Sequence, residues 1–256
     1  MTRRLAEMTW PAVVAAVAGG ATTVILPLGA TEQHGFHLPL GTDTFRAAAL
    51  AERLAAVLPG ALVAPPLPIG CSDEHQGFAG LLSLDRETLA GVIVDCARRM
   101  TGWGVSRLLI LSAHGGNGDA LDRAAARLAE ELPELGVVVL GGAAALSGAV
   151  LAVAARDGIS AEAVGLHAGE GETSEMLAVR PDLVLRERIV PGCCEDPAAL
   201  MLRLRQGGLR SVTPAGVLGD PRKADGARGA RYLAAAIEGY RRAVATGPAV
   251  EKGSPS

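Results

Sequence analysis

Short apolar runs alternate along the chain with longer segments whose apolar residues recur at helical spacing. The short runs are rich in valine, leucine and isoleucine, and they predict buried strands over residues 22–28, 61–65, 107–112 and 136–140. The longer segments predict helices over residues 44–57, 85–100, 119–132, 144–156, 173–179, 197–205 and 225–246. Asp85 is expected to cap the second of these helices, with Thr88 in its first turn.

This order of elements indicates the fold class. Strands that are apolar at nearly every position are typical of parallel sheets with helices on both faces. We therefore predict an α/β fold, a three-layer α/β/α sandwich with a mostly parallel central sheet. No repeat or low-complexity linker divides the chain, so residues 1–246 are predicted to form a single domain, followed by a flexible tail over residues 247–256.

Two apolar segments have the look of membrane or targeting signals. The uncharged run over residues 135–155 has the length of a membrane span, but glycine and serine residues interrupt it. We interpret it as a buried strand, a Gly-Gly turn and a buried helix that ends at Arg156. Near the amino terminus, Glu7 and Pro11 interrupt a basic and then apolar stretch, so we predict no signal peptide and interpret the following residues as core.

The composition excludes some classes of protein. The chain is 49% hydrophobic and 20% charged, which excludes a disordered chain. A formal net charge of −3 argues against a nucleic-acid binder with a broad basic face. The four cysteines show no CxxC spacing, which favours a reduced, cytoplasmic setting. The adjacent Cys193 and Cys194 are interpreted as inert surface or interface residues.

All five histidines fall in loop-like, glycine-rich segments beside carboxylates, a clustering typical of a functional site. The first cluster follows the strand over residues 22–28 and contains Glu32, His34, His37 and Asp43. Glu32 and His34 are two residues apart, so in an extended segment they point the same way, as two ligands of one site would. Asp43 is expected at a helix start, as a plain N-cap, as a ligand or as both.

The second and third clusters lie farther along the chain. His114, in the segment SAHGGNGD, ends the third strand, which fits a metal ligand. The glycines would also permit a phosphate-binding turn, but GGNG matches neither GxGxxG nor a Walker loop. Asn117 either holds this turn or donates to a substrate oxygen. The segment GLHAGEGETSEM brings His167, Glu170 and Glu172 into a glycine-rich loop before a predicted helix.

Two imidazoles and three carboxylates form the predicted ligand set: Glu32, His34, Asp43, His114 and Glu172. This set is larger than one zinc ion with an open position requires, and it suits two divalent ions. Mixed nitrogen and oxygen ligands suit Zn²⁺, Mn²⁺ or Fe²⁺, with no choice among them. The sequence therefore predicts a binuclear centre for hydrolysis of an amide bond. Whether Glu172 or Glu170 is the last ligand stays open.

Several sequence blocks resemble the creatininase family of metal-dependent amide hydrolases. They are LPLGATEQHGFHLPLGTD, GCSDEHQGFAGLLSL, SAHGGNGDAL, HAGEGETSEM and GVLGDPRKA, in this order along most of the chain. The resemblance implies a creatininase-like three-layer α/β fold, two metal ions per chain and a homo-oligomer. Creatininase itself is a hexamer.

The resemblance also implies roles for single residues. Family metal ligands fall on Glu32, His34, Asp43 and His114, with Asp43 on the bridging position. Creatininase itself has a Tyr-Glu pair directly after the last of these, and that glutamate binds metal. Here those positions are Gly115 and Gly116, so a ligand is missing. The His-Gly-Gly-Asn branch of the family recruits a later glutamate, which is Glu172 here.

The resemblance bears on catalysis and substrate as well. His167 falls on a histidine assigned as a proton shuttle, so His167 and Glu172 are the expected catalytic residues. Creatininase closes its site with tryptophans, whereas neither Trp10 nor Trp103 lies in a segment that looks like a lid, so creatinine is disfavoured. The blocks TWPAV, SDEHQGFAGLLSL and LRQGGLRSVTPAGVLGDPRKADGARG resemble the peptidase branch of mycofactocin biosynthesis. That branch implies cleavage of a radical-SAM-modified precursor peptide near its C-terminus, which releases a modified Val-Tyr-derived dipeptide.

Alternatives remain for the substrate and for the roles of nearby residues. Within the family, an amidohydrolase or deformylase would act on a small cyclic amide or formamide. Outside it, a non-catalytic nucleotide-binding or partner protein would use the same sheet. The candidate substrate contacts are His37, Glu74, His75 and Asn117, with a structural role as the alternative for Glu74 and His75 and the orientation of a ligand as the alternative for His37. No nucleic-acid or membrane partner is expected.

Overall fold

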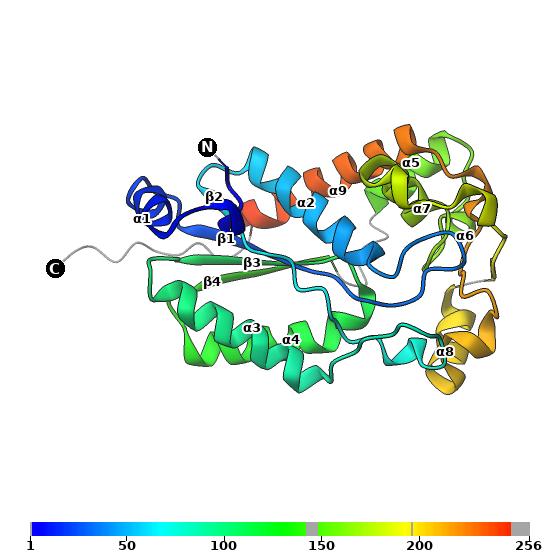
Figure 1. Cartoon of the computed structure of the whole chain (residues 1–256), viewed down its shortest axis with the longest axis horizontal. Helices are drawn as coiled ribbons and strands as arrows, with labels where there is room; N and C mark the ends of the chain where they lie inside the picture. The colour runs from blue at the N-terminus through cyan, green and yellow to red at the C-terminus, as the bar shows by residue number, and fades with distance from the viewer. Residues whose placement is uncertain (1, 142–147, 196, 247–256) are drawn as a thin grey trace.

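The computed structural model describes residues 2–141, 148–195 and 197–246. In this part of the chain a four-stranded sheet lies between two layers of helices (Figure 1). The strands are β1 (Thr23–Leu28), β2 (Ala61–Val63), β3 (Arg107–Ser112) and β4 (Gly136–Gly141), and they lie in the order β2-β1-β3-β4. Every pairing is parallel, so the predicted three-layer α/β fold is confirmed.

The helices follow one another between and after the strands. They are α1 (Trp10–Ala18), α2 (Thr42–Val57), α3 (Arg86–Thr101), α4 (Gly118–Glu131), α5 (Gly148–Arg156), α6 (Ala161–Val164), α7 (Glu170–Val179), α8 (Pro197–Val212) and α9 (Gly226–Thr246). Short 3-10 helices include η1 (Leu5–Glu7), η2 (Asp73–His75), η3 (Gly115–Asn117), η5 (Pro181–Leu183), η6 (Arg186–Arg188) and η7 (Pro221–Lys223).

Alternate residues of the central strands face opposite helix layers, because strand side chains alternate between the two faces of a sheet. Val24 and Leu26 of β1 belong to the core that includes residues of α3 and α4. Ile25, between them, belongs to the core that includes residues of α2 and α9. The sheet is therefore buried on both faces, as its continuous apolar runs predict.

The strand order creates a topological switch point at the carboxyl ends of β1 and β3. These two strands are neighbours, yet the chain passes through β2 between them. The connection after β1 enters α2 on one face of the sheet, and the connection after β3 enters α4 on the other (Figure 1). Ligands of open parallel sheets bind at such a switch point.

The amino-terminal helix α1 is not part of the core. None of its residues is buried, and Trp10 is 79% exposed. The sequence analysis predicted no helix here. The residues that follow this stretch form the buried strand β1, so the prediction that they belong to the core is confirmed. The segment WPAVVAAVA is apolar on all sides, so its sequence carries no sign of which face is covered.

Two helix boundaries differ from prediction by three residues or more. Helix α7 begins at Glu170 instead of residue 173, so Glu170 and Glu172 lie in its first turn, where the helix dipole favours negative charge. Helix α8 runs on to Val212 instead of residue 205, although Gly208 inside it has a positive φ of 68°. Of the helix predicted over residues 144–156, residues 144–147 lie outside the described part, as does the predicted tail over residues 247–256.

No helix in the described ranges is long and apolar enough to cross a membrane. The uncharged run over residues 135–155 instead contributes β4 and most of α5, on either side of residues that the structure does not describe.

Candidate metal centre

The predicted site residues meet at the carboxyl edge of the sheet. Glu32 and His34 follow β1, Asp43 lies in the first turn of α2, and His114 directly follows Ala113 at the end of β3. The amino end of α7 supplies two more site residues: His167 lies just before the helix, and Glu172 lies in its first turn. All of these residues except Glu172 are buried.

Asp43 lies between two imidazoles. Its Oδ1 is 3.5 Å from His34 Nε2, and its Oδ2 is 3.3 Å from His114 Nδ1. Asp43 is the second residue of α2, whose N-cap is Gly41, and its side chain caps no backbone N–H. The plain N-cap alternative is therefore wrong. A carboxylate whose two oxygens face two different imidazoles has the form expected of a ligand shared by two ions.

Glu32 is fully buried among three imidazoles. Its Oε2 lies 3.3 Å from His114 Nε2, and its Oε1 lies 3.2 Å from His75 Nε2 and 3.7 Å from His167 Nδ1. Glu32 therefore occupies the middle of the cluster, between the β3 loop and the segments that carry His75 and His167.

Several buried atoms at this point have no hydrogen-bond partner among the described residues. They are both carboxylate oxygens of Glu32, Nε2 of His34 and Oδ2 of Asp43. An unsatisfied buried polar atom costs about 1–3 kcal/mol, so such atoms are rare and call for an explanation. Each of them lies on a side chain that can bind a cation, and a divalent ion would satisfy them together.

The side chains form four overlapping groups that could each hold a metal ion. In each group the ligand atoms lie within 4.8 Å of one another. The groups are His34–Asp43–Glu172, Glu32–Asp43–His114, Glu32–His34–His167 and Glu32–Glu74–His75. The first two contain every predicted ligand and share only Asp43, so the residues present fit a pair of divalent ions.

Carboxylates hold two of the imidazoles in the protonated form. Burial alone would lower the pKa of His34, but Asp43 and Glu172 outweigh it and raise the pKa to about 9. Burial is likewise outweighed at His114, where Glu32 and Asp43 raise the pKa to about 10. Burial raises the pKa of Glu32 to about 7. A metal ion would therefore have to displace protons from this site.

The other three histidines are neutral. Burial lowers the pKa of His37 to about 4 and that of His75 to about 3, and the positive charge of His34 adds to both shifts. Burial and the same charge lower the pKa of His167 well below its usual value. Each of these imidazoles therefore offers one N–H donor and one lone pair.

Gln33 orients two of the neutral imidazoles, a role that the sequence analysis missed. Nε2 of His167 lies 2.7 Å from the Gln33 carbonyl, which can only accept, so Nε2 carries the proton. The lone pair of His167 Nδ1 then faces Glu32. The side-chain amide of Gln33 lies 3.3 Å from His75 Nδ1 and 3.2 Å from the Gly216 carbonyl.

Arg46 is a second functional residue that the sequence analysis missed. Its buried guanidinium donates through Nη1 to Glu172 Oε1 at 2.6 Å, to Asp43 Oδ1 at 3.2 Å and to the Ala113 carbonyl at 3.2 Å. Its Nε donates to Glu175 Oε2 at 2.7 Å. One cation thus fixes two candidate ligands that come from different helices. The spacing of Asp43 and Arg46 places them on one helix face, which was the available signal.

Glu170 and Glu172 have different partners. Glu170 is fully buried and accepts hydrogen bonds from Ser174 Oγ, Arg228 Nε and Tyr232 OH at 2.6, 2.7 and 2.8 Å. It thereby ties α7 to α9, and it belongs to none of the metal-binding groups found among the described residues. Glu172 Oε2 instead lies 3.6 Å from His34 Nε2. These contacts support Glu172 as the ligand.

The candidate substrate contacts have different surroundings. Glu74 and His75 lie in η2, where His75 is buried and the side chain of Glu74 is 37% exposed. His37 is fully buried, with Nε2 at 2.8 Å from Thr173 Oγ1, which supports an orienting role. Asn117 is also fully buried. Its side chain accepts from the Cys71 N–H and donates to the Gly29 carbonyl and to Ser112 Oγ, which supports a turn-holding role. Substrate contact stays a prediction for all four.

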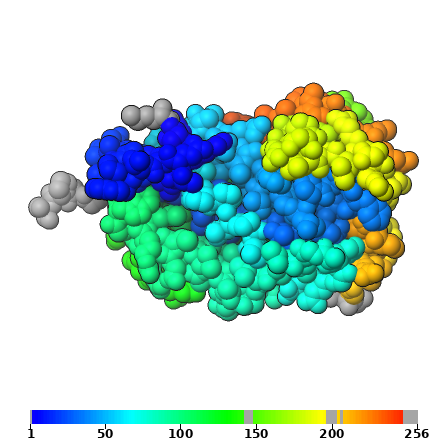
Figure 2. Space-filling model, in the orientation of Figure 1, coloured from blue at the N-terminus to red at the C-terminus, as the bar shows by residue number. Residues whose placement is uncertain are grey.

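The loop after β1 reaches the surface between two other segments. Figure 2 shows this loop, in blue, between the yellow segment that includes Leu185 and the cyan segment that follows β2. Leu185 N donates to the His37 carbonyl at 2.9 Å, and Leu82 N donates to the Thr31 carbonyl at 3.0 Å. Phe36, Leu82 and Leu185 are 58%, 52% and 50% exposed, so large apolar side chains surround the loop that carries the ligands.

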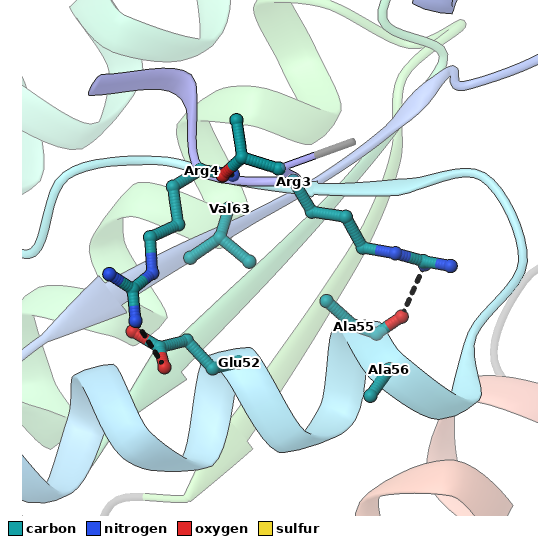
Figure 3. A pocket seen from close by; sticks show the side chains of 7 residues that line it. Arg3, Arg4, Glu52, Ala55, Ala56 and Val63 are labelled. Atoms are coloured by element: carbon teal, nitrogen blue, oxygen red, sulfur yellow. Dashed lines mark hydrogen bonds and ion pairs between the residues drawn. The ribbon is translucent and has the colours of Figure 1, made fainter. Parts of the chain in front are cut away.

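A pocket beside the carboxyl-terminal part of α2 lies away from the centre (Figure 3). Asp43 and Ala55 are twelve positions apart in α2, roughly 18 Å at 1.5 Å per residue. In the pocket, Arg4 pairs with Glu52 at 2.8 Å, and Arg3 donates to the carbonyls of Ala55 and Leu58. Its charged groups are thus paired with one another or with the backbone, unlike those of the centre.

No cysteine belongs to the metal-binding groups found among the described residues. Cys193 is partly exposed and Cys194 is exposed, in line with the expected surface position. Cys71 is buried and touches the centre only through its backbone, whose carbonyl lies 2.9 Å from His114 Nε2.

Comparison with known protein families gives one match over nearly the whole chain. The family model described as creatininase (creatinine amidohydrolase) matches residues 6–244. The mycofactocin precursor peptide peptidase of Mycobacterium ulcerans (strain Agy99) is 36% identical over 238 residues, which cover 90% of this chain and 83% of the relative. The protein of the same name from Mycolicibacterium smegmatis is 38% identical over 221 residues, which cover 84% and 81%.

Solved structures of creatininase share the fold. A crystal structure of creatinine amidohydrolase superposes with a TM-score of 0.82 and 30% identity, covering 95% of this chain and 96% of the other. A mutant creatininase described as Zn-Zn type gives a TM-score of 0.78 at 29% identity, covering 95% and 97%. A creatininase described with Mn gives 0.79 at 28%, covering 95% and 98%. Both metals were among those expected from the ligand chemistry.

Proposed function

The chain belongs to the creatininase family, and from that membership we propose that it cleaves a radical-SAM-modified mycofactocin precursor peptide near its C-terminus. The product would be a modified Val-Tyr-derived dipeptide. That the chain is a metal-dependent hydrolase of C–N bonds follows from its family and its relatives. The observation that carries the proposal is the cluster of fully buried ligand atoms without hydrogen-bond partners in the described chain, in a protein whose relatives are named as peptidases of this precursor.

We propose that the centre holds two divalent ions, Zn²⁺, Mn²⁺ or Fe²⁺. His34, Asp43 and Glu172 would hold one, and Glu32, Asp43 and His114 would hold the other. Such ions, when bound, polarise the scissile carbonyl and lower the pKa of water. The protein holds the ligands in place through Arg46, which fixes Asp43 and Glu172 from a buried position.

His167 is proposed as the residue that moves the proton. Its Nε2–H is committed to the Gln33 carbonyl, which leaves the lone pair of Nδ1 directed at the centre. Because burial keeps the pKa of His167 low, the imidazole is neutral and ready to accept a proton. It would then pass that proton to the leaving amine. His75 is neutral too, but Gln33 and Glu32 face its two nitrogens.

The surroundings of the centre favour a peptide with apolar side chains. Phe36 is exposed on the ligand loop, and Leu82 and Leu185 are exposed on segments next to it. Apolar contacts of this kind would hold valine and tyrosine side chains. The single domain over residues 1–246 is part of the proposal, because ligands come from both halves of the chain. A cytoplasmic setting, a homo-oligomeric assembly such as a hexamer, and the absence of nucleic-acid and membrane partners stay predictions.

The test is a product assay with the modified precursor. The protein, loaded in turn with Zn²⁺, Mn²⁺ and Fe²⁺, is incubated with modified and unmodified precursor, and peptides are identified by mass spectrometry. The proposal expects release of the C-terminal dipeptide from the modified precursor, loss of this activity with chelator, and no activity in His34→Ala. Hydrolysis of creatinine or a small formamide, with no cleavage of the precursor, would refute the proposed substrate and favour the small-amide alternative.

A further inference from the structure

Position 116 leaves no room for a side chain. A Cβ built on Gly116 would lie under 3.0 Å from the Cys71 carbonyl oxygen, His114 Nε2 and Glu74 Oε1. The Cys71 carbonyl cannot easily move aside, because it lies at 2.9 Å from His114 Nε2 and the Cys71 N–H is bound by Asn117 Oδ1. The loop that carries His114 therefore cannot supply a second ligand from position 116.

The carboxylate of Glu74 takes up that space. Its Oε1 is 2.6 Å from the point where a side chain at position 116 would begin and 3.6 Å from His114 Nε2. With Glu32 and His75 it forms one of the groups whose ligand atoms lie within 4.8 Å. Apart from His114, no cationic side chain in the described chain pairs with Glu74, which leaves an oxygen available.

The neighbouring Glu32 points to the same place. Its two oxygens are fully buried and accept no hydrogen bond from the described residues. They face His114 on one side and His75 on the other, at 3.3 and 3.2 Å. The segments after β2 and β3 thus converge on one unsatisfied carboxylate.

We propose that Glu74 is a direct ligand of the metal ion that Glu32 helps to bind. It is a further ligand beside Glu172 and occupies the space that a side chain at position 116 would need. This inference rests on the proposed metal-dependent function. It adds a ligand from η2, whereas the other proposed ligands lie after β1, in α2, after β3 and in α7. Because the side chain of Glu74 is 37% exposed, this ligand lies at the solvent side of the ion.

The placement of η2 is well defined by other contacts. Asp73 Oδ1 accepts from Ser83 Oγ at 2.8 Å, and Ser83 Oγ accepts from Ser72 N at 3.0 Å. On its other side η2 contacts α8, where Arg210 Nη1 donates to the Gly77 carbonyl at 2.6 Å. These hydrogen bonds hold η2 in place independently of the Glu74 side chain. Replacing that carboxylate should therefore change metal binding without moving the turn.

The experiment compares Glu74→Gln with Asp73→Asn. Both variants remove one negative charge from η2, and asparagine keeps an acceptor for Ser83. Each protein is stripped with chelator and titrated with Zn²⁺ by calorimetry, and metal content is measured after dialysis. Co²⁺ absorption reports the coordination of the bound ion, and circular dichroism checks the fold.

The inference expects two ions in the wild type and in Asp73→Asn. In Glu74→Gln it expects one ion to be lost or to bind at least tenfold more weakly, with a changed Co²⁺ spectrum. Glu74→Asp, whose side chain is one methylene shorter, is expected to fall between them. Two ions of unchanged affinity and spectrum in Glu74→Gln would overturn the inference and leave the proposed function standing. A wild type that binds no divalent ion would overturn both.

Discussion

Replacing Arg46 with leucine removes the cation that joins α2 to α7. The guanidinium lies 2.6 Å from Glu172, 2.7 Å from Glu175 and 3.2 Å from Asp43, and its side chain is 7% exposed. Glu175 is 9% exposed and has no other ion pair in the described chain. Burial raises its pKa even though Arg46 opposes the shift. The variant therefore leaves a buried carboxylate without its compensating charge.

The size of the effect follows from this burial. Removing one partner of a buried ion pair costs roughly 3–5 kcal/mol of unfolding free energy, whereas replacing both partners with apolar residues costs far less. Glu175→Leu leaves Arg46 with Asp43 and Glu172 as partners, so it should cost less than Arg46→Leu. The double variant should be more stable than the sum of the two single changes implies, by about 1–3 kcal/mol.

The assay is urea unfolding of the metal-free proteins, followed by circular dichroism and analysed as a double-mutant cycle. The same series with metal should show a smaller cost for Arg46→Leu, because bound ions compensate Asp43 and Glu172. A cost below about 1 kcal/mol for Arg46→Leu would refute the argument from burial. Strict additivity of Arg46→Leu and Glu175→Leu would refute the pairing itself.

Two further predictions concern the centre. Glu172→Gln should lose one metal ion and nearly all activity, whereas Glu170→Gln should keep both ions and lose about 1–3 kcal/mol of unfolding free energy through its buried hydrogen bonds. Elemental analysis measures the bound metal, and urea unfolding measures the stability. Loss of metal in Glu170→Gln would contradict the assignment of Glu172 as the ligand. Metal uptake at pH 7 should release about two protons from His34 and His114, whose pKa values are about 9 and 10 without metal, and about half a proton more from Glu32, whose pKa is about 7. Both histidine pKa values exceed those of unfolded histidine. Their contribution to the stability of the metal-free protein is therefore fully present below about pH 6.5 and is lost as the pH rises through 9 to 10. Calorimetry in buffers of different ionisation enthalpy measures the released protons, and a release near zero would contradict the prediction.

The sheet was predictable from the sequence because its signal is local. Strands β1 and β3 are buried on both faces, so each appears as an unbroken apolar run. Glu32, His34 and His114 were predictable for a related reason, since they directly follow these strands and the carboxyl ends of parallel strands share one edge. Helix α1 was missed, because a segment that is apolar on all sides shows no amphipathic periodicity.

Residues that act across long sequence separations were not predictable. Gln33 contacts His167 from 134 positions away, and Arg46 contacts Glu175 from 129 positions away. Neither residue type marks a metal site, and the predicted ligand segments in which they lie carry no sign of their distant partners. Their roles arise from packing, because α2 and α7 are brought together only in the folded chain.

The choice between Glu170 and Glu172 shows where the limit lies. The two residues are two positions apart in one glycine-rich segment, and a loop would allow either of them to face the centre. The helix begins at Glu170, so the two side chains project about 200° apart around its axis and cannot serve the same site. Which of them faces the metal ligands is then decided by Arg228 and Tyr232, 58 and 62 positions later, which bind Glu170. The sequence motif therefore identifies the segment that carries a metal ligand. Which glutamate of that segment is the ligand depends on Arg228, which binds Glu170 and leaves Glu172 to face the centre.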